Sequence, residues 1–113
     1  DPTKEESAVN WEALAATGGT IVVLMGVGKL PDYTAALRDA GMDPDTPVAL
    51  VERATRPEMR VATGTLDTIV GVRDDEGIEP PAITVIGAVA STRDRVVEFL
   101  RNRTGDAVEV ADE

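Results

Sequence analysis

Residues 20–26 read Thr-Ile-Val-Val-Leu-Met-Gly, with five apolar residues in succession, three of them β-branched. A strand with one solvated face exposes every second side chain, but this run has no polar position to expose. It therefore predicts a strand that is covered on both faces, as inside the sheet of an α/β domain. Ligands of such sheets bind beyond the carboxyl ends of the strands, which directs attention to Met25 and Gly26.

Helix and strand patterns alternate along the rest of the chain. Helices are predicted to begin near Asn10, Leu30 and Thr65 and at a capping box over residues 91–94, whose first residue is Ser91. Further strands are predicted to cover residues 48–51, 59–63 and 82–87. The connection between Val51 and Met59 is too short for a crossover helix, so these two strands should pair antiparallel. The predicted fold class is α/β: a three-layer domain with a mixed sheet of about four strands flanked by helices.

With 113 residues, the chain is long enough for one domain with its own core. Residues 1–9 are polar, lack apolar periodicity and are expected to be a linker. The folded domain is expected over residues 10–104, followed by a loose acidic tail over residues 105–113. The first residue is not methionine, and we expect the chain to begin in mid-protein.

The composition excludes several classes of site. The chain has no cysteine and no histidine, which removes thiolate nucleophiles, imidazole bases and most zinc or haem ligation. No apolar run approaches the length of a membrane span, and no signal peptide is evident, so a cytoplasmic domain is expected. The net charge of −10 argues against nucleic acid and anionic lipid as partners.

The acid excess also predicts adaptation to a salt-rich cytoplasm. Acidic residues outnumber basic ones by 21 to 11, and only Lys4 and Lys29 are lysines, which is typical of a halophile. Because salt screens the repulsion between surface carboxylates, the unfolding midpoint should rise with potassium chloride concentration. A midpoint that stays level or falls would contradict the halophile interpretation.

Residues 26–29, Gly-Val-Gly-Lys, do not form either of the common phosphate-binding motifs. A Walker loop needs glycine at the position of Val23 and a hydroxyl residue at the position of Leu30. The dinucleotide-binding pattern needs a third glycine where Pro31 stands. A strand-to-helix turn with a positive φ at Gly28 is the preferred interpretation.

Two acidic groups, Asp43 with Asp45 and residues 74–76, could chelate a hard cation. In a chain with 21 acidic residues, such groups arise by chance, so a solvated surface is preferred and no metal is predicted.

Three arginines, Arg53, Arg56 and Arg60, surround one predicted loop. Guanidinium groups recognise carboxylates well, so the cluster could bind a carboxylate-rich ligand. It could equally pair with acidic side chains of the surface, and the sequence leaves both interpretations open.

Four segments together resemble the tetrapyrrole methylases. They are Leu-Met-Gly at 24–26, Thr-Pro-Val-Ala-Leu-Val-Glu-Arg-Ala-Thr at 46–55, Arg-Val-Ala-Thr-Gly-Thr-Leu at 60–66 and Pro-Ala-Ile-Thr-Val-Ile-Gly at 81–87. They follow the family's order and spacing from about Trp11 to Val89. Each segment alone is weakly specific, and the four together are strongly so.

The resemblance is greatest to family members that methylate uroporphyrinogen III, and it implies a function. Such enzymes transfer methyl groups from S-adenosyl-L-methionine to ring carbons, producing S-adenosyl-L-homocysteine and precorrin-2 for sirohaem and cobalamin. They are homodimers of two-domain chains with the cofactor in the interdomain cleft. This chain resembles the carboxyl-terminal domain, which implies an amino-terminal partner domain, no catalytic residue here and no activity in isolation.

By position in the resemblance, Met25, Gly26, Ala54 and Ala82 are the expected cofactor contacts. Free backbone groups at the end of a strand can hydrogen-bond the edge of an adenine. Glycine lets a ligand approach closely, and two alanines leave room for a flat ring. We expect these residues at one end of the sheet, although ordinary close packing would also explain the alanines.

Two alternatives remain open. One is another enzyme of the same fold, such as a precorrin methyltransferase or diphthine synthase. The other is a free-standing ligand-binding or dimerisation module without catalysis. The upstream coding sequence would separate them, because the enzyme requires a strand and a glycine-rich loop there.

Overall fold

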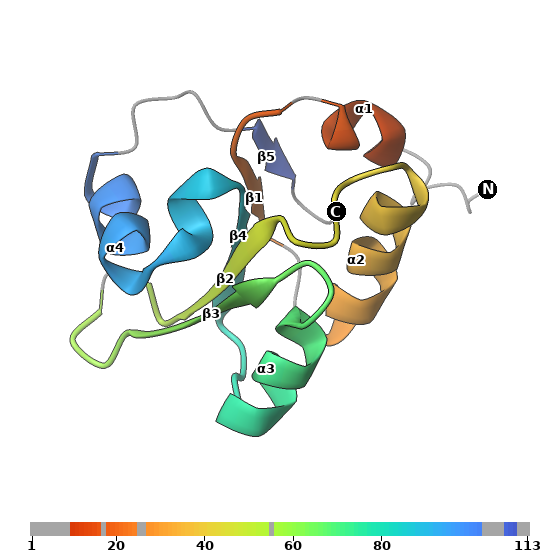
Figure 1. The fold of residues 1–113 in the computed structure, drawn as a ribbon. Helices are drawn as coiled ribbons and strands as arrows, with labels where there is room; N and C mark the ends of the chain where they lie inside the picture. The colour runs from red at the N-terminus through yellow and green to blue at the C-terminus, as the bar shows by residue number, and fades with distance from the viewer. Residues whose placement is uncertain (1–9, 17, 25–26, 55, 103–107, 111–113) are drawn as a thin grey trace.

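The computed structural model describes residues 10–16, 18–24, 27–54, 56–102 and 108–110 (Figure 1). In chain order the elements are α1 (Trp11–Ala15), β1 (Ile21–Val23), η2 (Val27–Lys29), α2 (Leu30–Asp39), β2 (Pro47–Glu52), β3 (Arg60–Thr65), α3 (Ile69–Glu76), β4 (Ala82–Ile86), η3 (Ala88–Ser91), α4 (Arg93–Asn102) and β5 (Val108–Val110). Helices α1, α2 and α3 cover one face of the sheet, and α4 with η3 covers the other. The three-layer α/β prediction is confirmed.

The sheet has the strand order β3-β2-β4-β1-β5. The pairs β2–β3, β2–β4 and β1–β4 are antiparallel, while β1 and β5 run parallel. The sheet is therefore mixed, as predicted, and the short connection after β2 does join an antiparallel pair. Strand β3 lies at one edge of this sheet.

Strand β5 departs from the sequence interpretation. Residues 108–110 were expected in a loose acidic tail, yet they pair with Ile21–Val23 of β1. The short Val-Glu-Val segment meets the open edge of β1, whose backbone groups need partners. The other boundaries remain predictions, and the expected linker over residues 1–9 lies outside the described residues.

Strand β1 is buried on both faces but is shorter than predicted. Ile21, Val22 and Val23 are at most 1% exposed, which confirms the covered strand. Leu24 is 43% exposed, so the buried run ends at Val23, before the apolar sequence does. Met25 and Gly26 lie outside the described residues.

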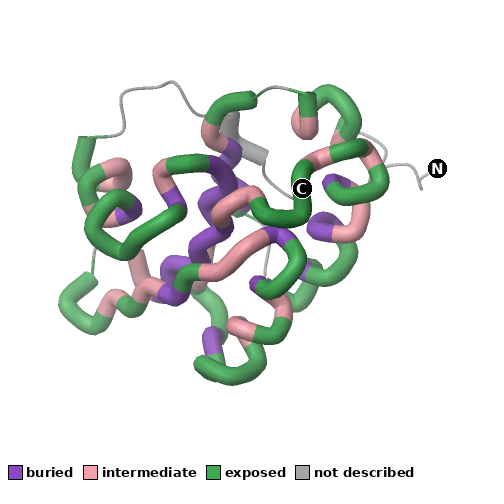
Figure 2. Tube along the Cα trace, viewed as in Figure 1, coloured by how far each residue is buried: buried purple, intermediate pink, exposed green. Residues whose placement is uncertain are grey.

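The core has two apolar clusters, one on each face of the sheet (Figure 2). Strand β2 shows the division, because Val48 and Leu50 join the cluster under α1, α2 and α3, whereas Ala49 and Val51 face α4. All four are fully buried. Successive side chains of one strand thus stabilise opposite layers.

The first and last helices carry side-chain caps, although the last is capped at Thr92 and not at Ser91, where the predicted capping box begins. The Asn10 side-chain oxygen accepts a hydrogen bond from the Ala13 amide at 3.0 Å. The Thr92 hydroxyl accepts one from the Arg95 amide at 3.2 Å. Each cap satisfies an amide that the first helical turn leaves without a backbone partner.

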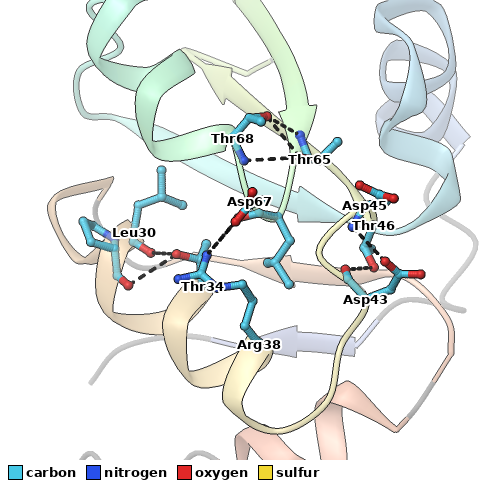
Figure 3. Close-up of polar contacts among 11 residues, drawn as sticks. Leu30, Thr34, Arg38, Asp43, Asp45, Thr46, Thr65, Asp67 and Thr68 are labelled. Carbon is cyan, nitrogen blue, oxygen red and sulfur yellow. Dashed lines mark hydrogen bonds and ion pairs between the residues drawn. The ribbon is translucent and has the colours of Figure 1, made fainter.

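The third predicted helix begins later than its sequence suggested. Thr65 and Thr68 exchange hydrogen bonds, with the Thr65 amide donating to the Thr68 hydroxyl at 2.9 Å and the Thr68 amide to the Thr65 hydroxyl at 3.2 Å (Figure 3). This turn carries the buried Leu66, and α3 starts only at Ile69. The two hydroxyl groups hydrogen-bond the backbone of a turn, whereas the sequence predicted that Thr65 would cap a helix.

The acidic pair before β2 organises a turn. An oxygen of the Asp43 carboxylate accepts from the Asp45 amide at 2.9 Å, and the Thr46 hydroxyl donates to the Asp43 carbonyl at 2.7 Å (Figure 3). Among the residues that the structure describes, no group of three or more acidic side chains could hold a metal ion.

No helix within the described ranges is long and apolar enough to cross a membrane.

Candidate functional site

Two of the four predicted cofactor contacts, Ala54 and Ala82, lie at the end of the sheet where β2 finishes and β4 begins, while Met25 and Gly26 lie outside the described residues. Register pairs Glu52 with Ala82, and the Arg53 amide donates to the Pro81 carbonyl at 2.9 Å. Ala54 follows Arg53 directly, so Ala54 and Ala82 lie at the same strand ends of the sheet, as predicted. This end of the sheet is called the edge below. Strand β1 runs toward the same edge, because its last residue, Val23, pairs with Thr84.

The two alanines belong to different faces of the sheet. Ala82 packs against the cluster under α1, α2 and α3, whereas Ala54 packs against the cluster under α4. Both are only partly buried. A ligand that contacted both would therefore lie across the strand ends rather than in a cavity on one face.

Leu24, which directly follows β1, also marks this edge. It is the one large apolar side chain of the described ranges that is exposed, at 43%. Sequence reasoning placed it inside the buried strand and so did not assign it to a surface. Exposure could not have been read from an unbroken apolar run.

Sequence reasoning also did not identify a buried carboxylate, that of Glu52, next to the strand ends that carry Ala54 and Ala82. Glu52 is 3% exposed, accepts from the Arg60 Nε at 2.7 Å and accepts from the Glu79 amide at 2.9 Å. The hydrogen bond from Arg60, followed by that from the Glu79 backbone, lowers the pKa of Glu52 below its usual value. The same bond raises the pKa of Arg60.

The ion pair between Glu52 and Arg60 explains one of the three arginines for which the sequence left a ligand and a surface partner equally open. Arg60 binds an acidic side chain of its own domain, with Glu52 directly opposite it in the β2–β3 register. The predicted antiparallel pairing could have identified the partner, because opposite charges favour facing positions on neighbouring strands.

The turn after β1 is held from a distant helix. The Arg73 Nη1 donates to the Val27 carbonyl at 2.7 Å, and the Arg73 side chain is largely buried. Gly28, in η2, does not adopt the positive φ that was expected of it. An arginine of α3 therefore holds the Val27 carbonyl, a long-range contact that no local pattern signals.

A cavity of about 330 Å³ opens at the opposite edge of the sheet. Its lining includes Thr20 before β1, Thr46 before β2 and Gly87 after β4. It is therefore separate from the edge that contains Ala54 and Ala82. Asp43 is also part of its lining, and the carboxylate of this residue accepts a hydrogen bond within a turn.

Comparison with known proteins places this geometry in context. Residues 1–70 match the profile of the tetrapyrrole (corrin/porphyrin) methylases. The S-adenosyl-L-methionine-dependent uroporphyrinogen III methyltransferase of Methanosarcina barkeri is 49% identical over 105 residues, which are 93% of this chain and 40% of the relative. The uroporphyrinogen-III C-methyltransferase of Pseudomonas fluorescens is 42% identical over 78% of this chain and 36% of its own length.

A solved structure agrees with these sequences. The uroporphyrin-III C-methyltransferase of Thermus thermophilus, complexed with S-adenosyl homocysteine, superimposes with a TM-score of 0.59 and 32% identity. The match covers 71% of this chain and 35% of that one. The chain thus spans well under half the length of these relatives. Fold, profile and identity lead to one conclusion: this chain belongs to the tetrapyrrole (corrin/porphyrin) methylase family.

Proposed function

We propose that this chain is the carboxyl-terminal domain of an S-adenosyl-L-methionine-dependent uroporphyrinogen-III C-methyltransferase and forms one wall of its cofactor cleft. The observation that carries the proposal is the meeting of Ala54, Ala82 and the end of β1 at one edge of the sheet. The resemblance assigned Met25, Gly26, Ala54 and Ala82 to the cofactor, although up to 57 residues separate them.

The described residues of this edge fit an adenosine. Both alanines are small and partly open, so a flat ring can approach the strand ends without displacing a side chain. The exposed Leu24 adds apolar surface that a second domain or a ligand could cover. No acid or base for proton removal is assigned to this chain, and we place those groups in the partner domain.

The chemistry needs little from this half of the enzyme. The bound cofactor supplies an activated methyl group on a sulfonium, which an electron-rich pyrrole carbon can attack. The methyl–sulfur bond breaks as the carbon–carbon bond forms, and the ring carbon then loses a proton. This domain contributes alignment and exclusion of water, so the isolated domain should be inactive.

The names of the relatives support the substrate, and the family resemblance supports the assembly. The relatives from Methanosarcina barkeri, at 49% identity, and Pseudomonas fluorescens, at 42%, are named for uroporphyrinogen III, which favours this substrate over a later precorrin. We extend the proposal to a cytoplasmic homodimer whose product enters the synthesis of sirohaem or cobalamin.

In the full-length enzyme, Ala54→Leu should raise the dissociation constant of S-adenosyl-L-methionine at least about tenfold, or roughly 1.4 kcal/mol. The branched side chain would occupy the space that we assign to the adenine. Titration calorimetry measures the effect directly.

Ala16→Leu is the matched control, because Ala16 is an exposed alanine at the end of α1 and away from this edge. Its cofactor affinity should equal that of the parent. Unchanged affinity for Ala54→Leu in a folded enzyme would refute the site assignment.

A further inference from the structure

Arg53 and Arg56 lie at the two ends of a tight turn that carries Ala54. The Arg56 amide donates to the Arg53 carbonyl at 3.1 Å, which is the hydrogen bond of a four-residue turn. Such a turn keeps its end Cα atoms within about 7 Å of each other. Two guanidinium-bearing residues therefore flank the alanine that we assign to the cofactor, in the loop that leaves the sheet after β2 (Figure 1).

Arg53 has an unusual backbone conformation. Its φ of 53° is the one positive value outside glycine among the described residues. A side chain in the left-handed region costs roughly 1–2 kcal/mol, and glycine avoids this cost. The Arg53 amide is held against the Pro81 carbonyl, which fixes the conformation next to Ala82. A strained arginine at this edge requires a reason other than stability.

Neither arginine forms an ion pair with an acidic side chain of the described residues, although the charge of Arg53 helps to lower the pKa of Glu52. The third arginine of the loop, Arg60, is paired with Glu52, and the remaining oxygen of Glu52 accepts from the Glu79 amide. Within the described part of the chain, Arg53 and Arg56 form no ion pair. This is notable in a chain with 21 acidic and 11 basic residues, where carboxylates are abundant.

We propose that Arg53 and Arg56 bind peripheral carboxylates of the tetrapyrrole substrate and so determine its position beside the cofactor. The inference rests on the proposed function. Uroporphyrinogen III is a polycarboxylate, and the planar guanidinium fork matches a carboxylate in two parallel hydrogen bonds. The methionyl carboxylate of the cofactor has the same chemistry, so the test must separate the two sources.

The strain at Arg53 supplies a variant that should fold. Arg53→Gly removes the guanidinium and relieves the positive φ, so the unfolding midpoint should stay level or rise. Arg56→Ala removes the second group, and the double variant removes both. Arg93→Ala is the matched control, because Arg93 is an exposed arginine that begins α4, after the opposite end of β4.

In the full-length enzyme, we expect each single variant to raise the KM for uroporphyrinogen III about tenfold, and the double variant further, since a hydrogen bond to a charged group contributes about 1.5–3 kcal/mol. The dissociation constant of S-adenosyl homocysteine, measured by calorimetry, should stay within about twofold, well below the tenfold that corresponds to 1.4 kcal/mol. Arg93→Ala should change neither quantity.

Two results would overturn the inference. An unchanged KM in the folded double variant would make both arginines ordinary surface residues. A parallel loss of affinity for S-adenosyl homocysteine would assign them to the cofactor.

The proposed function can fail separately, since the parent enzyme would then neither bind S-adenosyl homocysteine nor methylate uroporphyrinogen III. In that case, fluorescence titration with uroporphyrin III still tests whether the two arginines bind carboxylates of a tetrapyrrole. Weaker binding to the double variant than to the parent supports the carboxylate site, and equal binding overturns it.

Discussion

Replacing Gly87 by alanine is expected to lower the free energy of unfolding of the 113-residue chain by about 2–4 kcal/mol. Gly87 follows β4 with φ 134° and ψ −175°, a region that is essentially open to glycine alone and costs other residues roughly 1–3 kcal/mol. A Cβ atom there would also lie 3.1 Å from the Gly19 carbonyl oxygen and 3.4 Å from the Thr20 Cα. Both neighbours are backbone, so neither can rotate away. Urea unfolding followed by circular dichroism measures the loss.

Gly71→Ala provides a control of opposite sign. Gly71 is exposed within α3, and a Cβ atom there would meet nothing within 4 Å. Alanine should therefore stabilise the chain by about 0.5–1 kcal/mol through helix propensity. If Gly87→Ala were as stable as the parent, the backbone conformation assigned to Gly87 would be wrong.

The second large effect concerns Tyr33, whose hydroxyl is hydrogen-bonded to the Thr84 hydroxyl at 2.5 Å beneath the sheet. Tyr33 is 2% exposed and stacks on Trp11 with ring centroids 5.7 Å apart. Burial raises its pKa to about 12, and the Thr84 hydrogen bond and the charge of Arg73 only partly oppose this. The folded state therefore retains the phenol proton where the unfolded chain, with a pKa of 10.0, releases it.

Stability should accordingly be lost in alkaline solution. The contribution is fully present below pH 10 and disappears as the pH rises toward about 12, a loss of about 3 kcal/mol for a shift of this size. The chain has one tyrosine, so tyrosinate absorbance reports on Tyr33 alone. A midpoint near 10 in the folded protein would contradict the buried hydroxyl.

Comparison with Tyr33→Phe isolates this contribution from other alkaline titrations. At neutral pH this variant should be less stable than the parent by about 1–3 kcal/mol, because the buried Thr84 hydroxyl loses its partner. Its deficit should shrink between pH 10 and 12, since phenylalanine cannot ionise. Adding Thr84→Val should restore much of the stability, because both hydroxyls are then absent.

Local patterns were sufficient for most of the fold. The apolar run at residues 21–23 has no solvated position, so it had to be a covered strand. The short connection between Val51 and Met59 required an antiparallel hairpin. Asn10 marked the start of the first helix, and the capping box at residues 91–94 marked the last helix to within one residue, because such side chains satisfy the amides of a first turn.

Local patterns failed where a competing local hydrogen bond or a distant partner decided the outcome. Thr65 could cap a helix, but reciprocal bonds with Thr68 made a turn instead. Residues 108–110 have no apolar periodicity long enough to announce a strand, and only the open edge of β1 gives them a partner. Leu24 is as apolar as its neighbours, and only the course of the chain leaves it exposed.

The candidate site divides in the same way. Sequence resemblance alone selected Ala54 and Ala82, because small residues beside strand ends are too common for composition to distinguish them. The register of β2 against β4 decided that they share an edge, since a shift of the pairing would have separated them. The arginine cluster was visible in the sequence, but the partners of its members were not.

The sequence by itself determined the α/β class, the covered strand, the antiparallel hairpin and the family, because these depend on periodicity, chain length and residue order. The tertiary structure alone showed that Glu52 forms an ion pair with Arg60 and that Arg53 adopts a positive φ. It also showed that Arg56 lies next to Arg53 in a turn and has no acidic partner in the described chain. The physical reason is that ion pairs and backbone strain are set by which distant segments the packed sheet brings together. The sequence shows which residues are charged and which are glycines, and the fold determines which groups lie in contact with each of them.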